Sequence, residues 1–525
     1  MLLSFLLSSM IIFQNKVISI SIISKINLTE NFLPSTDNQF WEDLVDMTKL
    51  RAAQVAEEKP GSYYIKYMRN ILTTHEMRAF IGVRLLMENA IIKRRYTEYW
   101  RSDGKNFVHE TPGFHDIFER DRFLAIWTHL HVVNEQDPAV DKQDRIYKVR
   151  PLLNDMLTKF KNFYMPGEFL SLDEGMIPTK NRLSIKQNIK DKPIKWGIKS
   201  FLLTDSETGY IVNADIYTGF EDLQHPELGI TGNVVTRLLT GAGCDNRGHV
   251  LVMDRFYNSV SLFHHLFHKE KTFAVGTAMT NRKFFQKDIM CKKPATRGDS
   301  DYLSRENISC MVWNDRKPIY FLSNFHDPTN LGSCNRRQKN GTLIDVPAPT
   351  AVLDYNRFKC GCYLNDQQTQ LYKPRRHYKW PRRLIIKILM WAIYNAYVLH
   401  RESTVTKMNF TQFLDDVCYG LIGAFRSSHI RRSRRSNPNT EKRFLDVGIH
   451  MPEVPADTSC SHSCKVCYDK HMFFKKQYPN AKYGDIPTPI SKSTIRCSEC
   501  KVYLCLRRGT TCWKQYHSVR EYWRD

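Results

Sequence analysis

Apolar residues recur at helical spacing in two separate regions of the chain. They repeat every three or four positions through His75–Ile92 and Arg120–Val133, which is the period of a helix with one buried face. Residues 38–165 are therefore expected to be mostly helical. The same pattern returns in Tyr355–Phe425, where the apolar run Leu384–His400 is expected to form a buried amphipathic helix.

Between these regions the pattern changes to short apolar runs with the length and composition of β-strands. The turn Asp205–Gly209 separates two of the runs, and Val260–Phe267 again has helical spacing. The middle of the chain is thus expected to combine strands with helices. The predicted strands are Ser200–Thr204, Tyr210–Tyr217, Val250–Met253, Phe273–Ala278 and Ile319–Leu322.

The composition is that of a globular chain with a basic surface. Of 525 residues, 42% are hydrophobic and 25% are charged, which excludes wholesale disorder and a polytopic membrane protein. Lys and Arg exceed Asp and Glu by 23, and Leu371–Arg443 alone holds 16 basic and 4 acidic residues. A basic excess concentrated in one segment indicates a polyanionic partner, with nucleic acid as the first candidate.

Two apolar segments resemble targeting or membrane elements. Met1–Gln14 is similar to the apolar part of a signal peptide, but no basic residue precedes it and no clear cleavage site follows. Residues 1–37 are therefore expected to hold a packed terminal helix or a poorly defined start. Leu384–His400 has 17 residues, including Lys387, which is short for a membrane span of about 20 residues. No membrane association is expected.

Two Asp residues follow runs with the character of buried strands. Asp173 ends the run that begins at Phe169, and Asp254 ends Val250–Met253. A carboxylate at the end of an apolar strand is costly to bury without a partner. Two of them on neighbouring strands would form a site for divalent metal and phosphoryl transfer. The simpler interpretation is that each Asp caps a turn or the following helix.

A series of short motifs makes the chain resemble the piggyBac transposase family over nearly its whole length. Each motif is weak alone, whereas so many in the family's order are highly specific. The two carboxylate motifs resemble the family's first two catalytic segments. The motifs are Arg120–Phe123, Lys148–Pro151, Phe169–Pro178, Lys192–Lys199, Thr208–Tyr210, Asp215–Gly219, Asp254–Ser259, Gly276–Thr277, Asn281–Lys283, Trp313–Pro318, Asp354–Asn356 and Asn395–Tyr397.

The resemblance implies an α/β fold with an RNase H-like catalytic core and an insertion domain, a split helical DNA-binding and dimerisation domain, and a small C-terminal cross-brace zinc finger. It also implies a homodimer on double-stranded DNA, and Mg²⁺-dependent cleavage and joining at TTAA sites with three Asp ligands, of which Asp173 and Asp254 would be two. The implied boundaries are 1–37 for an uncertain N-terminal segment, 38–165 for the first helical part, 166–280 for the first core part, 281–348 for the insertion domain, 349–370 for the last core part, 371–425 for the second helical part, 426–459 for a basic linker and 460–517 for the zinc finger.

The third catalytic position departs from the family pattern. Tyr355–Gln367 aligns with the family's YNxxxGGVDxxDQ segment, and Tyr363 replaces the catalytic Asp. A neutral phenol cannot replace a carboxylate as a ligand for a hard cation. Asp366 lies one helical turn further on the same face and could reach a metal from a shifted position. We expect a transposase-derived DNA-binding protein defective in strand cleavage and transfer. The alternative is an active transposase that uses Asp366.

The basic segment mixes cations with aromatic side chains. Cations bind phosphates and aromatic rings stack on unpaired bases, and in the family a Trp of this region lies near the cleaved DNA end. The simpler interpretation is a solvated basic face with Trp380 packed on the following helix. Arg431–Arg435 resembles a nuclear localisation signal, so a nuclear protein is expected. The predicted DNA-contacting residues are Arg375, Arg376, Lys379, Trp380, Arg382 and Arg383.

Half of the cysteines lie in one C-terminal segment. Seven of 14 fall between Cys460 and Cys512, and two pairs have Cys-x2-Cys spacing. This indicates metal binding in a reducing compartment rather than a disulfide framework. Two structural Zn²⁺ ions would need eight ligands, of which seven are evident. They are Cys464, Cys467, Cys497, Cys500, Cys505, Cys512 and His517, with the eighth open among His450, Cys460 and His462.

The family's C-terminal finger, which binds terminal repeat DNA, implies how these ligands share the ions. In a cross-brace, alternate pairs bind the same metal. A RING-like ligase would have similar cysteine spacing, but it would leave residues 1–449 unexplained. The implied groups are Cys464, Cys467, Cys505 and Cys512 for one ion, and Cys497, Cys500, His517 and the eighth ligand for the other.

Three histidines, His264, His265 and His268, lie on the predicted helix after the second carboxylate motif or directly beyond it. The first and last are four residues apart, a spacing at which two imidazoles can bind a metal. Since the sequence indicates no third ligand, a place on a surface helix is the expected role of all three.

Overall fold

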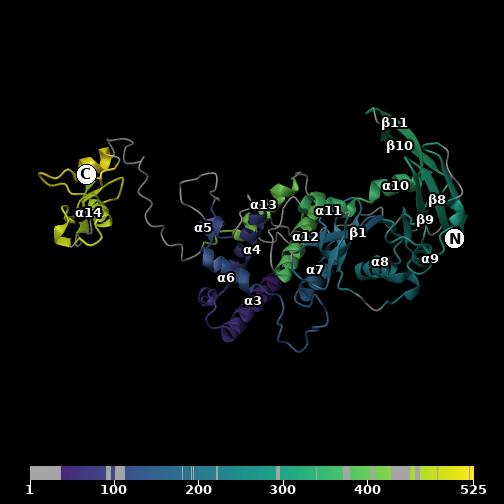
Figure 1. Ribbon diagram of the computed structural model, residues 1–525, viewed down its shortest axis with the longest axis horizontal. Helices are drawn as coiled ribbons and strands as arrows, with labels where there is room; N and C mark the ends of the chain where they lie inside the picture. Colours follow the sequence, from purple (N-terminus) through teal and green to yellow (C-terminus); the bar gives the residue numbers. More distant parts are fainter. Residues whose placement is uncertain are drawn as a thin grey trace. The chain divides into compact units, whose positions relative to one another are not determined.

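The computed structural model has two compact units, residues 1–427 and 428–525. Figure 1 shows their helices and strands. Over the part of the chain that is described, none of the helices has the length and hydropathy needed to cross a membrane. The described residues are 37–89, 96–100, 113–179, 181–190, 192, 194–219, 223–290, 296–338, 340–370, 379–403, 408–426, 450–455, 461–481, 483–519 and 521–524.

The first unit begins with a group of helices, as the apolar periodicity predicts. Asp37 caps the first of them through its side chain, which accepts a hydrogen bond from Phe40 N, and buried aromatic side chains fill the space between them. The helices are α3 (Asn38–Glu58), η1 (Ile65–Met68), α4 (Thr74–Asn89), η2 (Tyr96–Trp100), α5 (Phe114–Ile117), α6 (Arg120–His129) and α7 (Arg150–Phe163).

A nine-stranded mixed sheet follows, in the order β2-β3-β1-β5-β6-β9-β8-β7, with β4 also paired to β3. β1, β5 and β6 are parallel neighbours, and the other pairs are antiparallel. The strands are β1 (Phe169–Pro178), β2 (Lys186–Asn188), β3 (Trp196–Asp205), β4 (Ile211–Ile216), β5 (Val250–Met253), β6 (Phe273–Thr277), β7 (Ser300–Arg305), β8 (Ile308–Asn314) and β9 (Pro318–Ser323).

Residues 281–348, expected as an insertion domain, contribute β7, β8 and β9 to this sheet. They also form a separate antiparallel ribbon of β10 (Leu331–Arg337) and β11 (Leu343–Pro349). The remaining helices of the first unit are η4 (Pro226–Leu228), α8 (Gly229–Ala242), α9 (Val260–His268), η5 (Lys287–Met290), α10 (Thr350–Phe358), α11 (Gly361–Gln370), α12 (Trp380–Ser403) and α13 (Phe410–Ile422).

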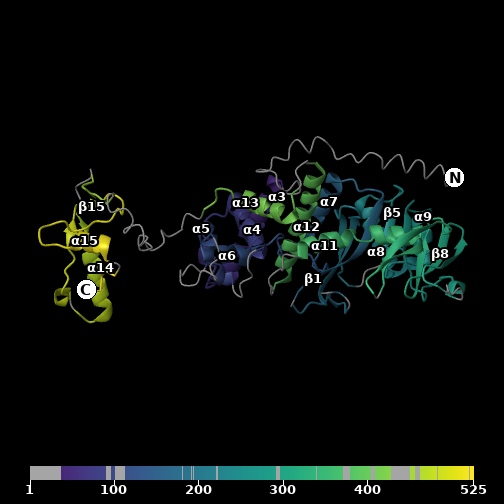
Figure 2. The same cartoon turned by 90° about the horizontal axis from the view of Figure 1, so that it is seen from above.

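Helices cover both faces of the central strands. Along β5, Val250 and Val252 pack with α10 in one cluster, whereas Leu251 and Met253 belong to the larger cluster that includes α8 and α9. Successive side chains of a strand point to opposite faces, so burial on both faces explains why this strand reads as a continuous apolar run. Figures 1 and 2 show the central strands and these helices from two directions.

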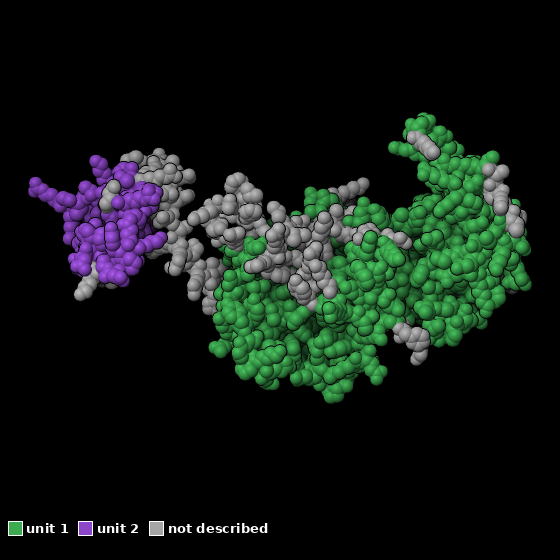
Figure 3. Space-filling view, viewed as in Figure 1, with its two compact units in different colours: residues 1–427 green, residues 428–525 purple. Residues whose placement is uncertain are grey.

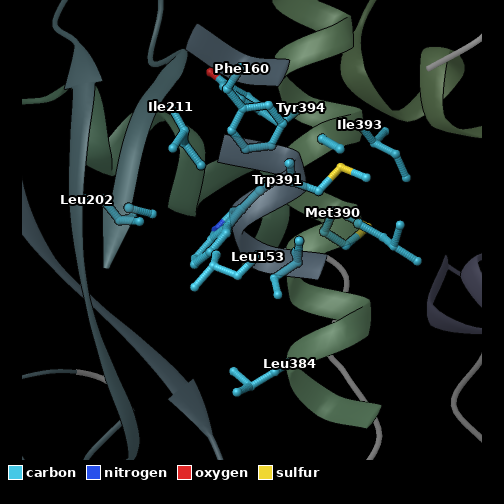
Figure 4. Close-up of a cluster of buried hydrophobic side chains, with 14 of the residues drawn as sticks. Leu153, Phe160, Leu202, Ile211, Leu384, Met390, Trp391, Ile393 and Tyr394 are labelled. Carbon is cyan, nitrogen blue, oxygen red and sulfur yellow. The ribbon is translucent and has the colours of Figure 1, made fainter. Parts of the chain in front are cut away.

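The predicted buried helix is confirmed in α12, which joins the first helices to the sheet. Trp391 and Tyr394 of α12 pack with Leu153 and Phe160 of α7 and with residues of β3 and β4 (Figure 4). Asn395 donates to Ile211 O at 2.9 Å and accepts from Ile211 N at 2.8 Å. α12 therefore satisfies the backbone of β4 as well as filling the core.

The second unit is the smaller of the two (Figure 3). It has its own core of cysteine and aromatic side chains. Its longest helix carries Cys467 and begins directly after Cys464. The described elements are β12 (Pro452–Glu453), β13 (His462–Ser463), α14 (Lys465–Gln477), η7 (Tyr483–Asp485), β14 (Lys492–Ser493), β15 (Arg496–Cys497) and α15 (Cys512–Ser518).

Candidate functional site

Two carboxylates reach the same face of the sheet on neighbouring strands, as the sequence predicts. β1 and β5 are parallel, with Ser171 opposite Val252. Because side chains alternate, Asp173 continues the face of Ser171, and Asp254 that of Val252. Neighbouring strands lie about 4.8 Å apart, so the two Asp residues stand side by side. Asp173 does not end its strand, however, because β1 runs on to Pro178 beside β3.

Contacts at the ends of β5 and β6 hold Asp254 in place. Asn258 is buried, and its Nδ2 donates to Met253 O at 3.1 Å and to Thr277 O at 2.8 Å. Thr277 Oγ1 donates to Asp254 Oδ1 at 3.1 Å. Gly276 permits this packing, because a Cβ there would lie 2.0 Å from Met253 O and 2.2 Å from Asn258 Nδ2. The loop is therefore built around the position of Asp254.

In the simpler interpretation each Asp caps a turn or the following helix; the helix half fits neither residue, whereas Asp254 does begin a turn, in which Tyr257 N donates to its carbonyl oxygen at 3.0 Å. Ser259 caps α9 by accepting a hydrogen bond from Leu262 N at 3.2 Å. Asp173 lies within a strand and precedes no helix. Neither carboxylate therefore serves to begin a helix.

Asp173 is surrounded by charges of both signs. Lys192 Nζ lies 3.4 Å from its Oδ1, and Glu174 N donates to the same oxygen at 2.7 Å. Burial and the neighbouring carboxylate of Glu174 raise the pKa of Asp173, and Lys192 opposes this shift. The balance favours the protonated form of Asp173, and Lys192 offsets only part of the shift.

Helices α10 and α11 bring the predicted third catalytic segment to this face. Gly361 lies against β1, since a Cβ there would be 2.7 Å from Ser171 Oγ. Cys362 N donates to the same oxygen at 3.3 Å. The next residue, Tyr363, is 62% exposed. Asp366 lies on α11, but its side chain is outside the described residues. The segment thus packs against Ser171, two residues before Asp173 in β1, and leaves Tyr363 exposed to solvent.

The described side chains supply no third acid to the pair. No group of three donors within 4.8 Å includes Asp173 or Asp254 in the described parts of the chain. Tyr355 of α10 is nearby and buried, and burial raises its pKa to about 12, with the charges of Asp254 and Asp173 contributing. It therefore stays neutral. Two carboxylates beside a phenol bind a hard divalent cation less well than three carboxylates.

Eight donors of the second unit gather in two groups of four, with the donor atoms of each group within 4.8 Å of one another. Cys467 Sγ lies 4.0 Å from Cys505 Sγ and 3.7 Å from Cys512 Sγ. A tetrahedral thiolate site with bonds of about 2.3 Å has edges of about 3.8 Å, whereas a disulfide bond is about 2.05 Å long. The groups are Cys464, Cys467, Cys505 and Cys512, and His450, Cys497, Cys500 and His517.

The imidazoles of the second group are oriented as metal ligands. His450 Nδ1 lies 3.4 Å from both Cys497 Sγ and Cys500 Sγ, and His517 Nε2 lies 3.8 Å from Cys500 Sγ. His517 Nδ1 lies 2.9 Å from the carbonyl oxygen of Trp513, which can only accept. The proton therefore sits on Nδ1, and Nε2 presents its lone pair to the group, as in many metal-binding histidines.

The thiols are crowded enough to shift each other's ionisation. Hydrogen bonding from Cys464 lowers the pKa of Cys467, whereas burial and the charge of Cys464 raise the pKa of Cys505 to about 12. Several thiolates cannot share this volume without a cation, and a bound divalent cation would ionise them all. The donor set therefore fits a metal that prefers thiolate and imidazole ligands.

His450 is the donor that the sequence alone left open. β12 pairs with β15, with Pro452 opposite Cys497, and this brings His450 to a cysteine 47 residues away. His462 stacks instead on Tyr503, with ring centroids 4.2 Å apart, and Cys460 lies outside the described residues. No motif spacing signals His450, because its approach depends on the strand pair.

Comparisons with known proteins show the family of the chain. A sequence-family model described as Transposase IS4 matches residues 27–397. PiggyBac transposable element-derived protein 3 of Homo sapiens is 27% identical over 459 residues, covering 85% of this chain and 70% of that protein. PiggyBac transposable element-derived protein 2 of Homo sapiens is 28% identical over 405 residues, covering 74% and 66%. The chain belongs to the piggyBac transposase family.

A solved piggyBac structure has the same fold. The cryo-EM structure of a piggyBac transposase synaptic complex with hairpin DNA matches 90% of this chain and 94% of its own, with a TM-score of 0.65 and 18% identity. An identity this low supports the fold alone. The α/β prediction is confirmed at that level, as a piggyBac-like fold with a mixed sheet.

The basic residues predicted to contact DNA divide into different environments. Arg382 and Arg383 are buried, and Arg382 donates to Thr128 O at the end of α6. We therefore remove these two from the predicted DNA-contacting set. Lys379 is exposed and Trp380 half-buried against the core, as its simpler interpretation expects. Arg375 and Arg376 lie outside the described residues.

Proposed function

We propose that this chain is a piggyBac transposase-derived DNA-binding protein that has lost strand cleavage and transfer. The observation that carries the proposal is Tyr363 at the third catalytic position. The phenol is 62% exposed, on the segment that packs against β1 at Ser171, and no group of three donors among the described residues includes Asp173 or Asp254. Catalysis by two metal ions depends on carboxylates that hold both ions in position, so this substitution is expected to remove activity while the fold persists.

Retained DNA binding is supported by charge that the chain does not neutralise internally. Lys379 is exposed at the start of α12, where its ammonium group can meet the phosphates of a polyanion. The net charge of +23 also favours binding of a polyanion such as DNA.

The proposal extends to the layout of the chain and its metals. The layout is an RNase H-like core from 166–280 and 349–370 with an insertion at 281–348, a helical DNA-binding and dimerisation domain from 38–165 and 371–425, and a basic linker that leads to a cross-brace zinc finger. The finger holds two structural Zn²⁺ ions and begins at His450 rather than at 460, since His450 belongs to a donor group. A nuclear homodimer on double-stranded DNA, with Mg²⁺ at the carboxylates only if the site is active, completes the proposal.

An excision assay in cells tests the loss of activity. A reporter interrupted by the terminal repeats that flank the genomic copy is repaired only if the protein excises the insert. We expect no excision by the unaltered chain and no excision by Asp173→Asn. Tyr363→Asp tests whether the third carboxylate restores activity, with Tyr363→Phe as the matched control that keeps the ring.

DNA binding is measured on the same repeats with the same proteins. Binding by all four proteins, without excision by the unaltered chain, supports the proposal. Excision by the unaltered chain that Asp173→Asn abolishes would instead establish an active transposase, with Asp366 as the candidate third ligand. Absence of repeat binding by every protein would reject the DNA-binding role.

A further inference from the structure

Helix α9 carries histidines on two sides, and each side meets a carboxylate from elsewhere in the chain. Donor atoms of His264, His268 and Glu306 all lie within 4.8 Å of one another. On the other side, His265 approaches His225 and Glu227 within the same limit. The sequence suggested no third ligand for these histidines, because Glu306 reaches α9 only through the fold of β7 and β8.

The first group has the arrangement of a transition-metal site. His264 and His268 are one helical turn apart, with ring centroids separated by 4.3 Å. Two imidazoles and a carboxylate form the protein part of many zinc sites that keep an open position. A tetrahedral site with bonds of about 2.1 Å has edges of about 3.4 Å, so donor atoms within 4.8 Å of one another need to close by at most about 1.4 Å.

Glu306 is an unusual residue for its backbone position. Arg305 pairs with Ile308, so Glu306 is the first residue of a two-residue hairpin turn, and its φ is +55°. Gly is favoured at such a position because other L-residues are strained there. The turn itself therefore does not explain a Glu, whereas a ligand facing two histidines does.

The three side chains are also free to bind. His264, His268 and Glu306 make no hydrogen bond or ion pair with any described residue, and all three are exposed. The second group is already engaged, since His265 Nε2 lies 3.4 Å from Glu270 and His225 Nδ1 lies 3.5 Å from Glu227. The first group is therefore the better candidate.

Two of the three donors line a cavity. A cavity of about 640 Å³ is lined by His264 and Glu306 together with Lys269, Lys283 and Arg305. These cations would oppose a bare divalent ion but favour one that also carries an anion. The surroundings therefore suit a metal with an exchangeable anionic or water ligand.

The geometry points to a divalent transition-metal site of the Zn²⁺ class at His264, His268 and Glu306, which ties the β7–β8 turn to α9. It is separate from the carboxylate pair and from the cysteine groups. Because no described protein group orients either imidazole, the site binds more weakly than a site with such support and releases its metal before the cysteine groups do.

Cobalt titration of the full-length protein, with its cysteine groups loaded with zinc, tests the site. Co²⁺ bound by imidazole and carboxylate gives a visible d–d band, whereas entry into a thiolate group adds an intense near-ultraviolet charge-transfer band. We expect one equivalent with the first signature only. His264→Gln with His268→Gln should weaken binding at least tenfold, and His265→Gln on the same helix should leave it unchanged.

Two variants of Glu306 separate ligation from folding. Glu306→Gln and Glu306→Gly should both weaken Co²⁺ binding at least tenfold. Glu306→Gly should also raise the Tm of the zinc-loaded protein in the absence of Co²⁺, since it relieves the positive φ. Binding that survives the double His variant, that is lost in His265→Gln, or that is absent from the unaltered protein would overturn the proposal.

Discussion

The carboxylate pair of the main sheet and the cysteine groups of the second unit differ in how far the chain assembles their ligands. On the main sheet, Asp173 and Asp254 stand side by side, and the described residues add no third acid. In the second unit, eight donors stand in two groups of four with the spacing of tetrahedral sites. The first region is a pair of carboxylates on a sheet that is stable without them. The second region is a set of eight donors that themselves make up much of the core of their unit.

This difference follows from what each set of ligands does for the fold. The carboxylates lie at the surface of a sheet whose core is apolar on both faces, so the sheet does not need them. The cysteines form much of the small core of the second unit, so the metals that we propose there would supply much of its folding energy. A catalytic ligand can therefore be lost without loss of fold, whereas a cysteine cannot.

The largest effect is expected for Cys467→Ser. Structural zinc contributes about 10–16 kcal/mol to folding in zinc-finger peptides, so removal of one thiolate should leave the second unit unfolded. Native mass spectrometry should show lost zinc, and limited proteolysis should cleave residues 450–525. Cys334→Ser, a half-buried thiol of β10, is the control. Equal zinc content in both variants would contradict the comparison.

A smaller effect is expected in the first unit for Gly276→Ala. The new Cβ would approach Met253 O to 2.0 Å, and overpacking of this kind costs about 3 kcal/mol. The midpoint of urea unfolding should fall for the first unit while zinc content stays unchanged. Gly61→Ala, where nothing lies within 4 Å, should leave the midpoint within error. An unchanged midpoint for Gly276→Ala would show that Asp254 is not held as described.

The pH dependence of Asp173→Asn should be smaller still. The raised pKa of Asp173 means that its favourable contribution is complete below the unfolded pKa of about 3.9 and is lost as pH rises through the folded value. The variant cannot ionise, so it should gain stability relative to the parent between pH 4 and pH 8. Since the side chain is 36% exposed, screening limits the gain to about 1 kcal/mol or less.

Thermal unfolding at both pH values measures this gain. Lys192→Met is the companion variant, because Lys192 opposes the rise in the pKa of Asp173. Without Lys192, the protein should lose more stability than the parent when the pH is raised from 4 to 8. Parallel pH profiles for the parent and Asp173→Asn would contradict a raised pKa.

The smallest effect on stability is expected for Tyr363→Asp. The side chain is exposed, so the free energy of unfolding should change by about 0.5 kcal/mol or less without metal. A third carboxylate should, however, make the Tm respond to Mn²⁺, because a ligand that binds only the native state stabilises it. Tyr363→Phe should give no response. If Tyr363→Asp also gives none, position 363 does not hold the missing ligand.

Elements with apolar periodicity could be predicted closely. β5 and α9 match the predicted Val250–Met253 and Val260–Phe267 almost residue for residue, because their buried positions are occupied by apolar residues at the spacing of a strand or a helix. β7, Ser300–Arg305, could not be predicted, since it lies at the edge of the sheet and most of its side chains are polar and partly exposed. The same cause hides the β10–β11 ribbon.

Within the candidate sites, residues that belong to a local motif could be predicted from the sequence. Contacts between residues far apart in the sequence could not. The carboxylates and the cysteine pairs follow from motifs, whereas His450 depends on a two-residue strand pair. Arg382 appears in the sequence as one cation in a basic run, but α12 turns it toward Thr128, 254 residues earlier. Composition cannot distinguish a cation that meets solvent from one that meets a carbonyl group.

The interleaved order of the eight donors has a consequence for synthesis on the ribosome. The first group ends with Cys512, and the second opens with His450 and closes with His517. Neither group can close until the final donors have left the ribosome, although most of the others emerged well before. Domains usually fold in the order in which they are translated, so with the two zinc ions that we propose the second unit would fold late, after its last donors emerge. Capture of both proposed ions would then require translation through His517.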